Sequence, residues 1–182
     1  VFLRGSQEEM WQKVMQLQFA PNPREILPWV INQGVGATIE AYGGNVNDAT
    51  RAVRDGAVSI TKWTNALRAT LRNATGHGEL MSSLRRAALS DDGQLLLVNA
   101  GIDITRPLDA QSDSFWWGGT DFSAITEPYG EVQRIVRGFD RAKQGVVQSQ
   151  HTLSLDGGCG RGGPLLAALL APDGQTIDVF ES

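Results

Sequence analysis

The polar residues best placed for chemistry follow a short apolar segment in the middle of the chain. Residues 95–98 read Leu-Leu-Leu-Val after an Asp-Gly turn, a pattern that predicts a buried strand. Asn99 stands at the end of this strand, before a glycine-containing loop. Open α/β sheets bind ligands at the carboxyl ends of their strands. We therefore expect residues 94–119 to carry a site.

Acidic residues surround the loop that follows Asn99. Asp103, Asp109 and Asp113 could form an oxygen-rich site for a hard metal ion. The alternative is that they cap turns and pair with Arg106, and we favour this structural role.

Other residues with chemical potential are scattered along the chain. His77 lies in a Gly-His-Gly loop and His151 in an alternating segment, and we favour structural roles over metal binding for both. Residues 157–163, Gly-Gly-Cys-Gly-Arg-Gly-Gly, lack the Gly-Lys-Ser/Thr of a nucleotide loop and precede a predicted strand. An anion held there by Arg161 stays open as an alternative. We interpret Cys159 as a small buried hydrophobe rather than a nucleophile.

Composition excludes several classes of function. The net charge of −4 and the lack of a basic stripe give no reason to expect a nucleic-acid partner. The longest apolar run, residues 164–172, is far shorter than the roughly 20 residues of a membrane span. A single cysteine fits a reducing compartment, so we predict a cytoplasmic location. The length of 182 residues predicts one domain over residues 1–182.

The first half of the chain has helical periodicity. After an opening strand at residues 1–3, Ser6 and Glu9 have the spacing of a capping box and predict a helix. Further helices are predicted from residue 22 toward Gly34, with residues 37–42 as a link, and then at 48–55, 58–73 and 79–89. Asn47 is the predicted N-cap of the helix over residues 48–55.

The second half has strand periodicity. Strands are predicted at residues 132–136 and 147–155, and residues 165–170 and 176–180 form a predicted hairpin through Pro-Asp-Gly. Helices first and antiparallel strands later, around a central strand, indicate an α/β (α+β) layered sandwich of mixed β-sheets flanked by helices.

The order of several motifs resembles the phosphoprotein (serine/threonine) phosphatase branch of the calcineurin-like metallophosphoesterases, bacterial type. The family's Gly-Asn-His-Glu aligns with Gly5-Ser-Gln-Glu8, its His-Gly/Ala-Gly with Asn99-Ala-Gly101, and its Gly-His with Gly138-Phe139. Arg106-Pro-Leu-Asp109 and Phe115-Trp-Trp117 add to the likeness. So do Leu155-Asp-Gly-Gly158, Gly162-Gly-Pro-Leu165 and the final hairpin.

The resemblance implies a damaged metal centre. The family's metal-ligand positions are Ser6, Asn99 and Phe139 here, and its general-acid position is Gln7. A phenyl ring cannot coordinate a metal, and amides bind Mn, Fe or Zn poorly relative to imidazole. An amide also cannot protonate a leaving group as a general acid does. The family's two amino-terminal metal motifs would lie upstream of Val1, so we expect a domain truncated at that end and missing its first strands.

The resemblance supports two functional hypotheses. The first is a catalytically impaired scaffold or subunit in a protein assembly, without a cofactor in this segment. The alternative is an active metal-dependent phosphomonoesterase or protein phosphatase that holds two divalent metals (Mn, Fe or Zn) with motifs upstream of Val1. Whether the chain is an enzyme is left open. In either case we expect a protein partner or an upstream segment to complete the sheet.

Several residues are predicted to contribute to binding. These are Arg4, Asp103, Arg106, Trp116, Trp117 and Arg161. Successive side chains alternate along a strand, so at least one aromatic of residues 115–117 would approach the surface. The alternative, slightly favoured, is a helical turn that directs all three into the core.

Overall fold

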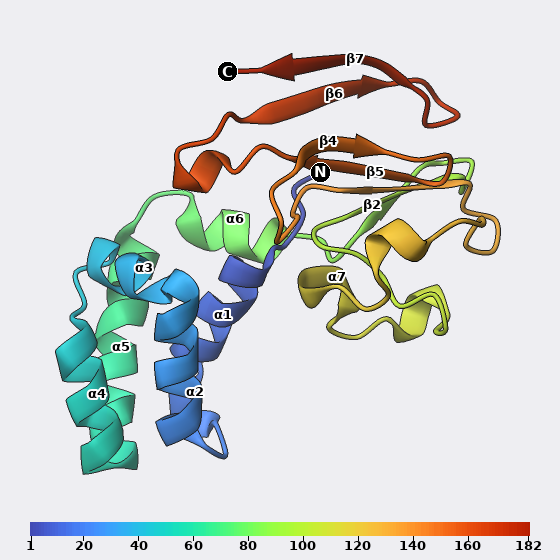
Figure 1. Ribbon diagram of the computed structural model, residues 1–182. Helices are drawn as coiled ribbons and strands as arrows, with labels where there is room; N and C mark the ends of the chain where they lie inside the picture. The colour runs from blue at the N-terminus through green and yellow to red at the C-terminus, as the bar shows by residue number, and fades with distance from the viewer. The chain divides into compact units, whose positions relative to one another are not determined.

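The computed structural model describes residues 1–182, and the chain forms two compact units (Figure 1). One unit is Ser6–Leu84, and the other combines Val1–Gly5 with Arg85–Ser182. The first of these is a helical unit, and the second contains all the strands. The single domain expected from the length stays a prediction. No helix in the chain has the length and apolar character needed to cross a membrane.

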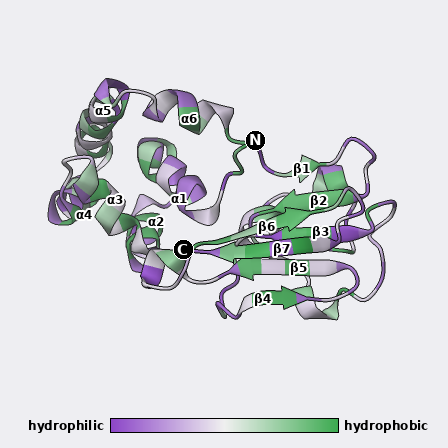
Figure 2. Cartoon of the chain, turned by 90° about the horizontal axis from the view of Figure 1, so that it is seen from above, coloured by the Kyte–Doolittle hydropathy of each residue, from purple (hydrophilic) through white to green (hydrophobic).

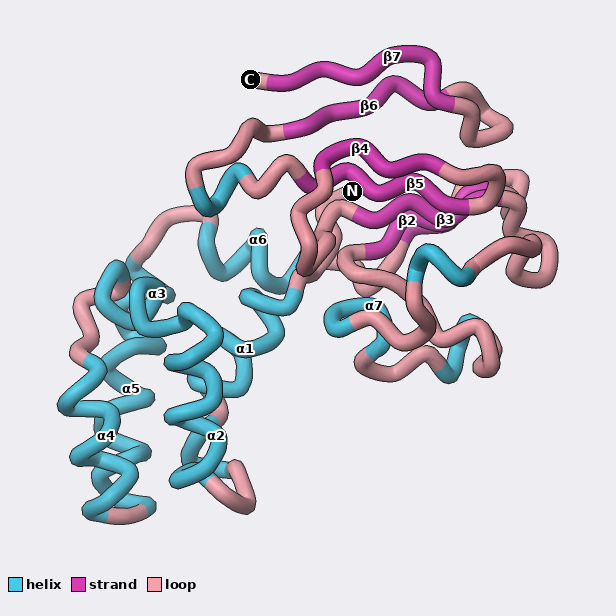
Figure 3. The backbone as a smooth tube through the Cα atoms, viewed as in Figure 1, coloured by secondary structure: helices cyan, strands magenta, loops and turns pink.

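The helical unit is a succession of short helices (Figure 3). Its elements are α1 (Ser6–Met15), η1 (Leu17–Phe19), α2 (Pro23–Val30), η2 (Ile31–Val35), α3 (Gly36–Ala41), α4 (Val46–Asp55), α5 (Ala57–Asn73) and α6 (His77–Ser83). Its core consists of buried apolar side chains from several helices, such as Val14, Leu27, Ile39, Ile60 and Leu67. Ile60 and Leu67 lie seven residues apart on one face of α5.

Local chemistry explains most of these helix boundaries. The predicted helices at residues 48–55 and 58–73 are confirmed as α4 and α5. The cap of α4, however, is Asn45 rather than the predicted Asn47, because the Asn45 Oδ1 accepts the N–H groups of Asn47 (2.8 Å) and Asp48 (3.2 Å). Residues 37–42, predicted as a link, lie mostly in α3. Gly34 has φ 100°, a left-handed conformation that lets the chain kink and continue as helix.

The predicted helix at residues 79–89 is wrong in its second half. Helix α6 ends at Ser83, and Arg85 then forms a parallel bridge with Leu3. The backbone N–H of Arg4 donates to the Arg85 oxygen at 2.7 Å. Hydrogen bonds to residues 2–4 thus replace the helical hydrogen bonds that were predicted for Arg85. The predicted opening strand at residues 1–3 is reduced to this single bridge. Val1 and Phe2 are 94% and 68% exposed.

The second unit contains a five-stranded mixed sheet. Its strands are β1 (Ala88–Leu89), β2 (Leu95–Val98), β3 (Arg134–Arg137), β4 (Gly145–Gln148) and β5 (Thr152–Asp156), in the order β1-β2-β3-β5-β4. Strands β2, β3 and β5 are parallel, and the edge strands β1 and β4 are antiparallel to their neighbours. The mixed α/β class predicted from the sequence is therefore confirmed.

One predicted strand is in fact two. Residues 147–155 alternate in polarity, which predicted a single strand, but the chain turns back between β4 and β5. The Ser149 hydroxyl accepts the N–H groups of His151 (3.3 Å) and Thr152 (3.1 Å) and so closes this turn. Polar alternation is compatible with both arrangements, and pairing between Val147 and Ser154 selects the hairpin.

The two faces of the sheet are covered by different elements. On one face Leu96, Val98 and Ile135 pack against the cluster around α7 (Ser114–Trp117) and η4 (Phe122–Ala124), with η3 (Leu108–Ala110) in the same region of the chain. On the opposite face lies the antiparallel hairpin of β6 (Leu166–Leu170) and β7 (Thr176–Glu181), which follows η5 (Cys159–Arg161). Figure 1 shows α7 and the hairpin on opposite sides of the sheet, a layered arrangement.

A buried arginine connects the hairpin to the sheet. The Arg134 guanidinium donates from Nη1 to the Gly174 oxygen at 2.6 Å, in the turn between β6 and β7. Arg134 is 5% exposed, and burial lowers its pKa while the nearby charge of Asp173 opposes that shift. The turn is therefore fixed over the sheet at this end.

Candidate functional site at the carboxyl edge of the sheet

The carboxyl ends of β2, β3 and β5 meet at one edge because these strands are parallel. Asn99 follows β2 and Gly138 follows β3. The Asn99 carbonyl oxygen accepts the N–H groups of Gly138 (3.1 Å) and Phe139 (2.8 Å). The structure therefore brings together Asn99 and Phe139, two positions that the sequence places 40 residues apart.

An arginine at the end of β3 is held in a polar network. The Arg137 Nη2 lies 2.9 Å from Asp140 Oδ1, and its Nε donates to the Ser154 Oγ at 2.9 Å. The guanidinium carbon also lies 4.3 Å from the centre of the Phe122 ring. The Arg137 and Asp140 side chains are only 18% and 7% exposed, so this is a largely buried, neutralised ion pair.

The carboxylates at this edge hold loops in place. Asp156 accepts the N–H groups of Asp140 (2.8 Å) and Gly158 (2.9 Å), and Asp140 accepts the N–H of Ala142 (3.1 Å). The sequence reasoning missed Arg137, Asp140 and Ser154 because their partnership depends on strand register. The alternation of β3 and β5 could have placed Arg137 and Ser154 on one face, but only a known pairing makes them neighbours.

Two buried polar atoms at this edge have no hydrogen-bond partner. They are the Asn99 Nδ2 and the Asp140 Oδ2. A buried polar group left without a partner costs about 1–3 kcal/mol. Such atoms are uncommon in folded proteins, and they can mark a functional site.

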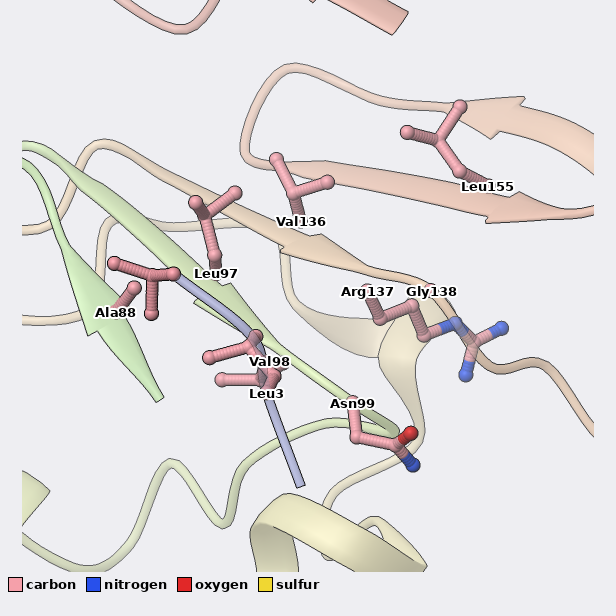
Figure 4. Close-up of a pocket in the computed structure, with 10 residues that line it drawn as sticks. Leu3, Ala88, Leu97, Val98, Asn99, Val136, Arg137, Gly138 and Leu155 are labelled. Atoms are coloured by element: carbon pink, nitrogen blue, oxygen red, sulfur yellow. The ribbon is translucent and has the colours of Figure 1, made fainter. Parts of the chain in front are cut away.

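A mainly apolar cavity of about 330 Å³ opens beside Asn99 (Figure 4). Its lining comes from the first residues, β1, β2, β3 and β5, and consists of Val1, Leu3, Ala88, Leu97, Val98, Asn99, Val136, Arg137, Gly138 and Leu155. The volume is at the lower end for small-molecule sites. Because the charge of Arg137 is neutralised by Asp140, the lining suits apolar groups better than a phosphate.

The donor set does not fit a transition-metal centre. Phe139 offers no lone pair, and Asn99 offers an amide. Nowhere in the chain do three or more His, Cys, Asp or Glu side chains cluster closely enough to hold a metal ion. Ser6 and Gln7 begin α1 in the helical unit, where the Gln7 Nε2 donates to the Gln33 oxygen at 2.9 Å.

Both histidines make ordinary structural contacts. The His77 Nδ1 lies 2.6 Å from the Tyr42 hydroxyl in the helical unit. The His151 Nδ1 lies 2.8 Å from the Gln133 oxygen, and this side chain is buried. These contacts agree with the structural roles that the sequence favours.

The loop after Asn99 is organised by a buried glutamine. Gln111 is fully buried, and its amide bonds the main chain of Asp103 through both Oε1 (2.7 Å) and Nε2 (2.8 Å). The Asp103 carboxylate caps its own turn at Thr105 and pairs with the Arg106 Nε at 3.1 Å. These Thr105 hydrogen bonds lower the pKa of Asp103. Asp103 and Arg106 therefore have the structural roles that the sequence favours.

The aromatic segment at residues 115–117 is a helical turn rather than a strand. Phe115 and Trp116 are 4% and 7% exposed and belong to the core cluster, while Trp117 is half-buried against it. Of the two tryptophans predicted to bind, only Trp117 therefore offers substantial surface. The favoured alternative of a helical turn describes the observed backbone.

The glycine-rich loop folds tightly upon itself. Its N–H groups at residues 161 and 163 both donate to the Gly158 oxygen, and that at residue 162 donates to the Cys159 oxygen. A Cβ atom on Gly163 would lie 1.9 Å from the Gly157 oxygen, so this crossing requires glycine. These N–H groups are consequently unavailable to an anion. Cys159 is exposed, which corrects the expectation of a buried thiol.

Comparison with known proteins adds no assignment. No family model matches the chain, and neither do any of the curated proteins or solved structures searched.

Proposed function

We propose that this chain has a metallophosphoesterase-like fold of the phosphoprotein-phosphatase type, and that it acts as a catalytically impaired scaffold or binding subunit. The observation that carries the proposal is the junction of Asn99 and Phe139. A main-chain hydrogen bond joins a residue with an amide side chain to one with a phenyl side chain at the carboxyl edge of β2 and β3, where the resembled family has imidazole ligands. Two-metal hydrolysis needs ligands that hold both ions against the phosphate.

The parallel strands and the opposing hairpin support the proposed fold. The two motifs of the resemblance that stand at metal-ligand positions in this unit, Asn99-Ala-Gly101 and Gly138-Phe139, directly follow β2 and β3. The cytoplasmic location predicted from the single cysteine is part of the same proposal.

Metal analysis tests the impaired centre. We expect the purified chain, dialysed against Mn²⁺, Fe²⁺ or Zn²⁺ and then against buffer, to retain well below one ion per chain, because the imidazoles that ligate metal in the resembled family are replaced. Hydrolysis of p-nitrophenyl phosphate should not exceed that of an Asn99→Ala variant. Two retained ions per chain, lost in Asn99→Ala together with hydrolysis, would support the active phosphoesterase instead.

A gain-of-ligand variant tests the resemblance itself. Since the backbones of Asn99 and Phe139 are hydrogen-bonded at 2.8 Å, the double variant Asn99→His/Phe139→His should bring two imidazoles together. We expect Zn²⁺ to raise the melting temperature of the double variant but not of either single variant, as a ligand of the folded state does. No Zn²⁺ response in the double variant would count against a metal-centre ancestry for this edge.

We also propose that a protein partner adds a strand to the two-stranded β6–β7 sheet. The missing first strands expected from the resemblance find no open edge at β2, which already pairs with β1 and β3. Isolated two-stranded hairpins are marginal in water, and open edges invite additional strands. We expect amide hydrogens of β6 to exchange much faster than those of β3 in the isolated chain. A monomeric chain that protects β6 as strongly as β3 would show that the sheet is already complete.

A further inference from the structure

Four large apolar side chains lie exposed on the outer face of the β6–β7 hairpin. Leu165, Leu169, Ile177 and Phe180 are 61%, 51%, 63% and 54% exposed. The alternate residues of β6 are half-buried, so the hairpin turns its other face toward the five-stranded sheet. We call the four exposed residues the hairpin patch.

The strand register makes the hairpin patch continuous. Ala167 pairs with Phe180 and Leu169 pairs with Asp178, so Phe180 lies diagonally opposite Leu169, at roughly 7–8 Å. A register shift beside Leu170 leaves Ile177 as an extra residue of β7, and such a bulge redirects its side chain. Figure 2 looks onto this layer and shows both strands largely in hydrophobic colours.

The charged residues of the hairpin itself have one sign. Residues 164–182 contain Asp173, Asp178 and Glu181 but no Lys or Arg. Asp178 is exposed opposite Leu169, and it takes part in no ion pair. Arg134, which contacts the hairpin turn from beneath, is buried and donates to the Gly174 oxygen. The patch is therefore apolar with an acidic border.

We infer that the hairpin patch binds a segment of a partner protein that carries large apolar side chains flanked by Lys or Arg. Contiguous exposed apolar surface is typical of interaction sites, and complementary charge selects among partners. A second copy of the chain fits less well, because the acidic borders of both copies would meet without a cation. An anionic membrane would be repelled for the same reason. This inference rests on β6 and β7 alone and does not depend on the proposed impaired metal centre.

Fluorescence anisotropy with the full chain tests the inference. The probe is a labelled synthetic peptide of alternating Leu and Trp with Lys at both ends, and the matched peptides replace Lys by Glu or the apolar residues by Ser. We expect the Lys peptide to bind at least tenfold more tightly than either matched peptide. The double variant Leu169→Ser/Phe180→Ser should weaken binding at least tenfold, and Asp178→Lys about threefold, as expected for one exposed charge. Val58→Ser, a change at an exposed apolar residue of the helical unit, is the matched control.

Four results would overturn the inference. One is equal affinity for the Lys and Glu peptides, and another is unchanged binding in both hairpin variants while their melting temperatures match that of Val58→Ser. The third is a dimer in sedimentation equilibrium that Leu169→Ser/Phe180→Ser dissociates, because a second copy would then cover the patch. Stronger binding to phosphatidylserine vesicles than to the Lys peptide would likewise contradict it.

Discussion

Replacing Trp116 by alanine is expected to lower the free energy of unfolding by about 3–5 kcal/mol, because the indole is 7% exposed within the core cluster. Its ring also lies under the Arg86 guanidinium, 5.2 Å from the ring centre. Trp117→Ala should cost much less, since this side chain is only partly buried. Urea denaturation followed by circular dichroism measures both losses.

The Trp116→Ala and Trp117→Ala variants also distinguish a core role from a binding role. Phe19→Ala provides the control, because Phe19 is 79% exposed and its truncation should leave stability nearly unchanged. If Trp116→Ala proved as mild as Phe19→Ala, the indole would not be part of a packed core. If Trp117→Ala weakened association with a partner at unchanged melting temperature, the predicted binding role of Trp117 would be supported.

Removing the charge of Asp140 is expected to destabilise the chain by about 3–5 kcal/mol, because it leaves Arg137 buried without its counter-ion. The Asp140→Asn variant tests this in urea. The double variant Asp140→Leu/Arg137→Met should recover most of the loss, since removing both charges also removes the desolvation penalty.

An exposed pair provides the comparison for Asp140. The Arg51 and Asp48 side chains are 63% and 57% exposed and 3.4 Å apart, so Asp48→Asn should cost less than about 1 kcal/mol. Equal effects of Asp140→Asn and Asp48→Asn would mean that solvent screens the Arg137 pair as well. Solvent would then reach the Arg137–Asp140 pair more readily than its low exposure indicates.

The hairpin patch and the carboxyl edge make different demands on a partner. The edge offers an apolar cavity next to Asn99, whereas the patch offers exposed aliphatic and aromatic side chains with an acidic border. The two surfaces belong to different layers of the same unit.

The sequence alone determined the elements whose signals are local. The apolar run at 95–98 became β2, the helical spacing of Ile60 and Leu67 became one buried face of α5, and the Pro-Asp-Gly turn joined β6 to β7. In each case a side-chain period or a turn residue specifies the backbone within a few residues. Asn99 was located correctly at a strand end for the same reason.

Only the tertiary structure decided which distant residues meet. The predicted helix does not extend over residues 84–89, because Arg85 pairs with Leu3 and Ala88 pairs with Leu97. The partnership of Arg137 with Ser154 follows from the register between β3 and β5, and a slip of one residue would turn Ser154 to the other face. Periodicity records which side of an element is apolar, but it does not record which element covers that side. That choice depends on packing among segments far apart in the chain, so the Arg137 network and the exposed hairpin patch emerge only in the folded protein.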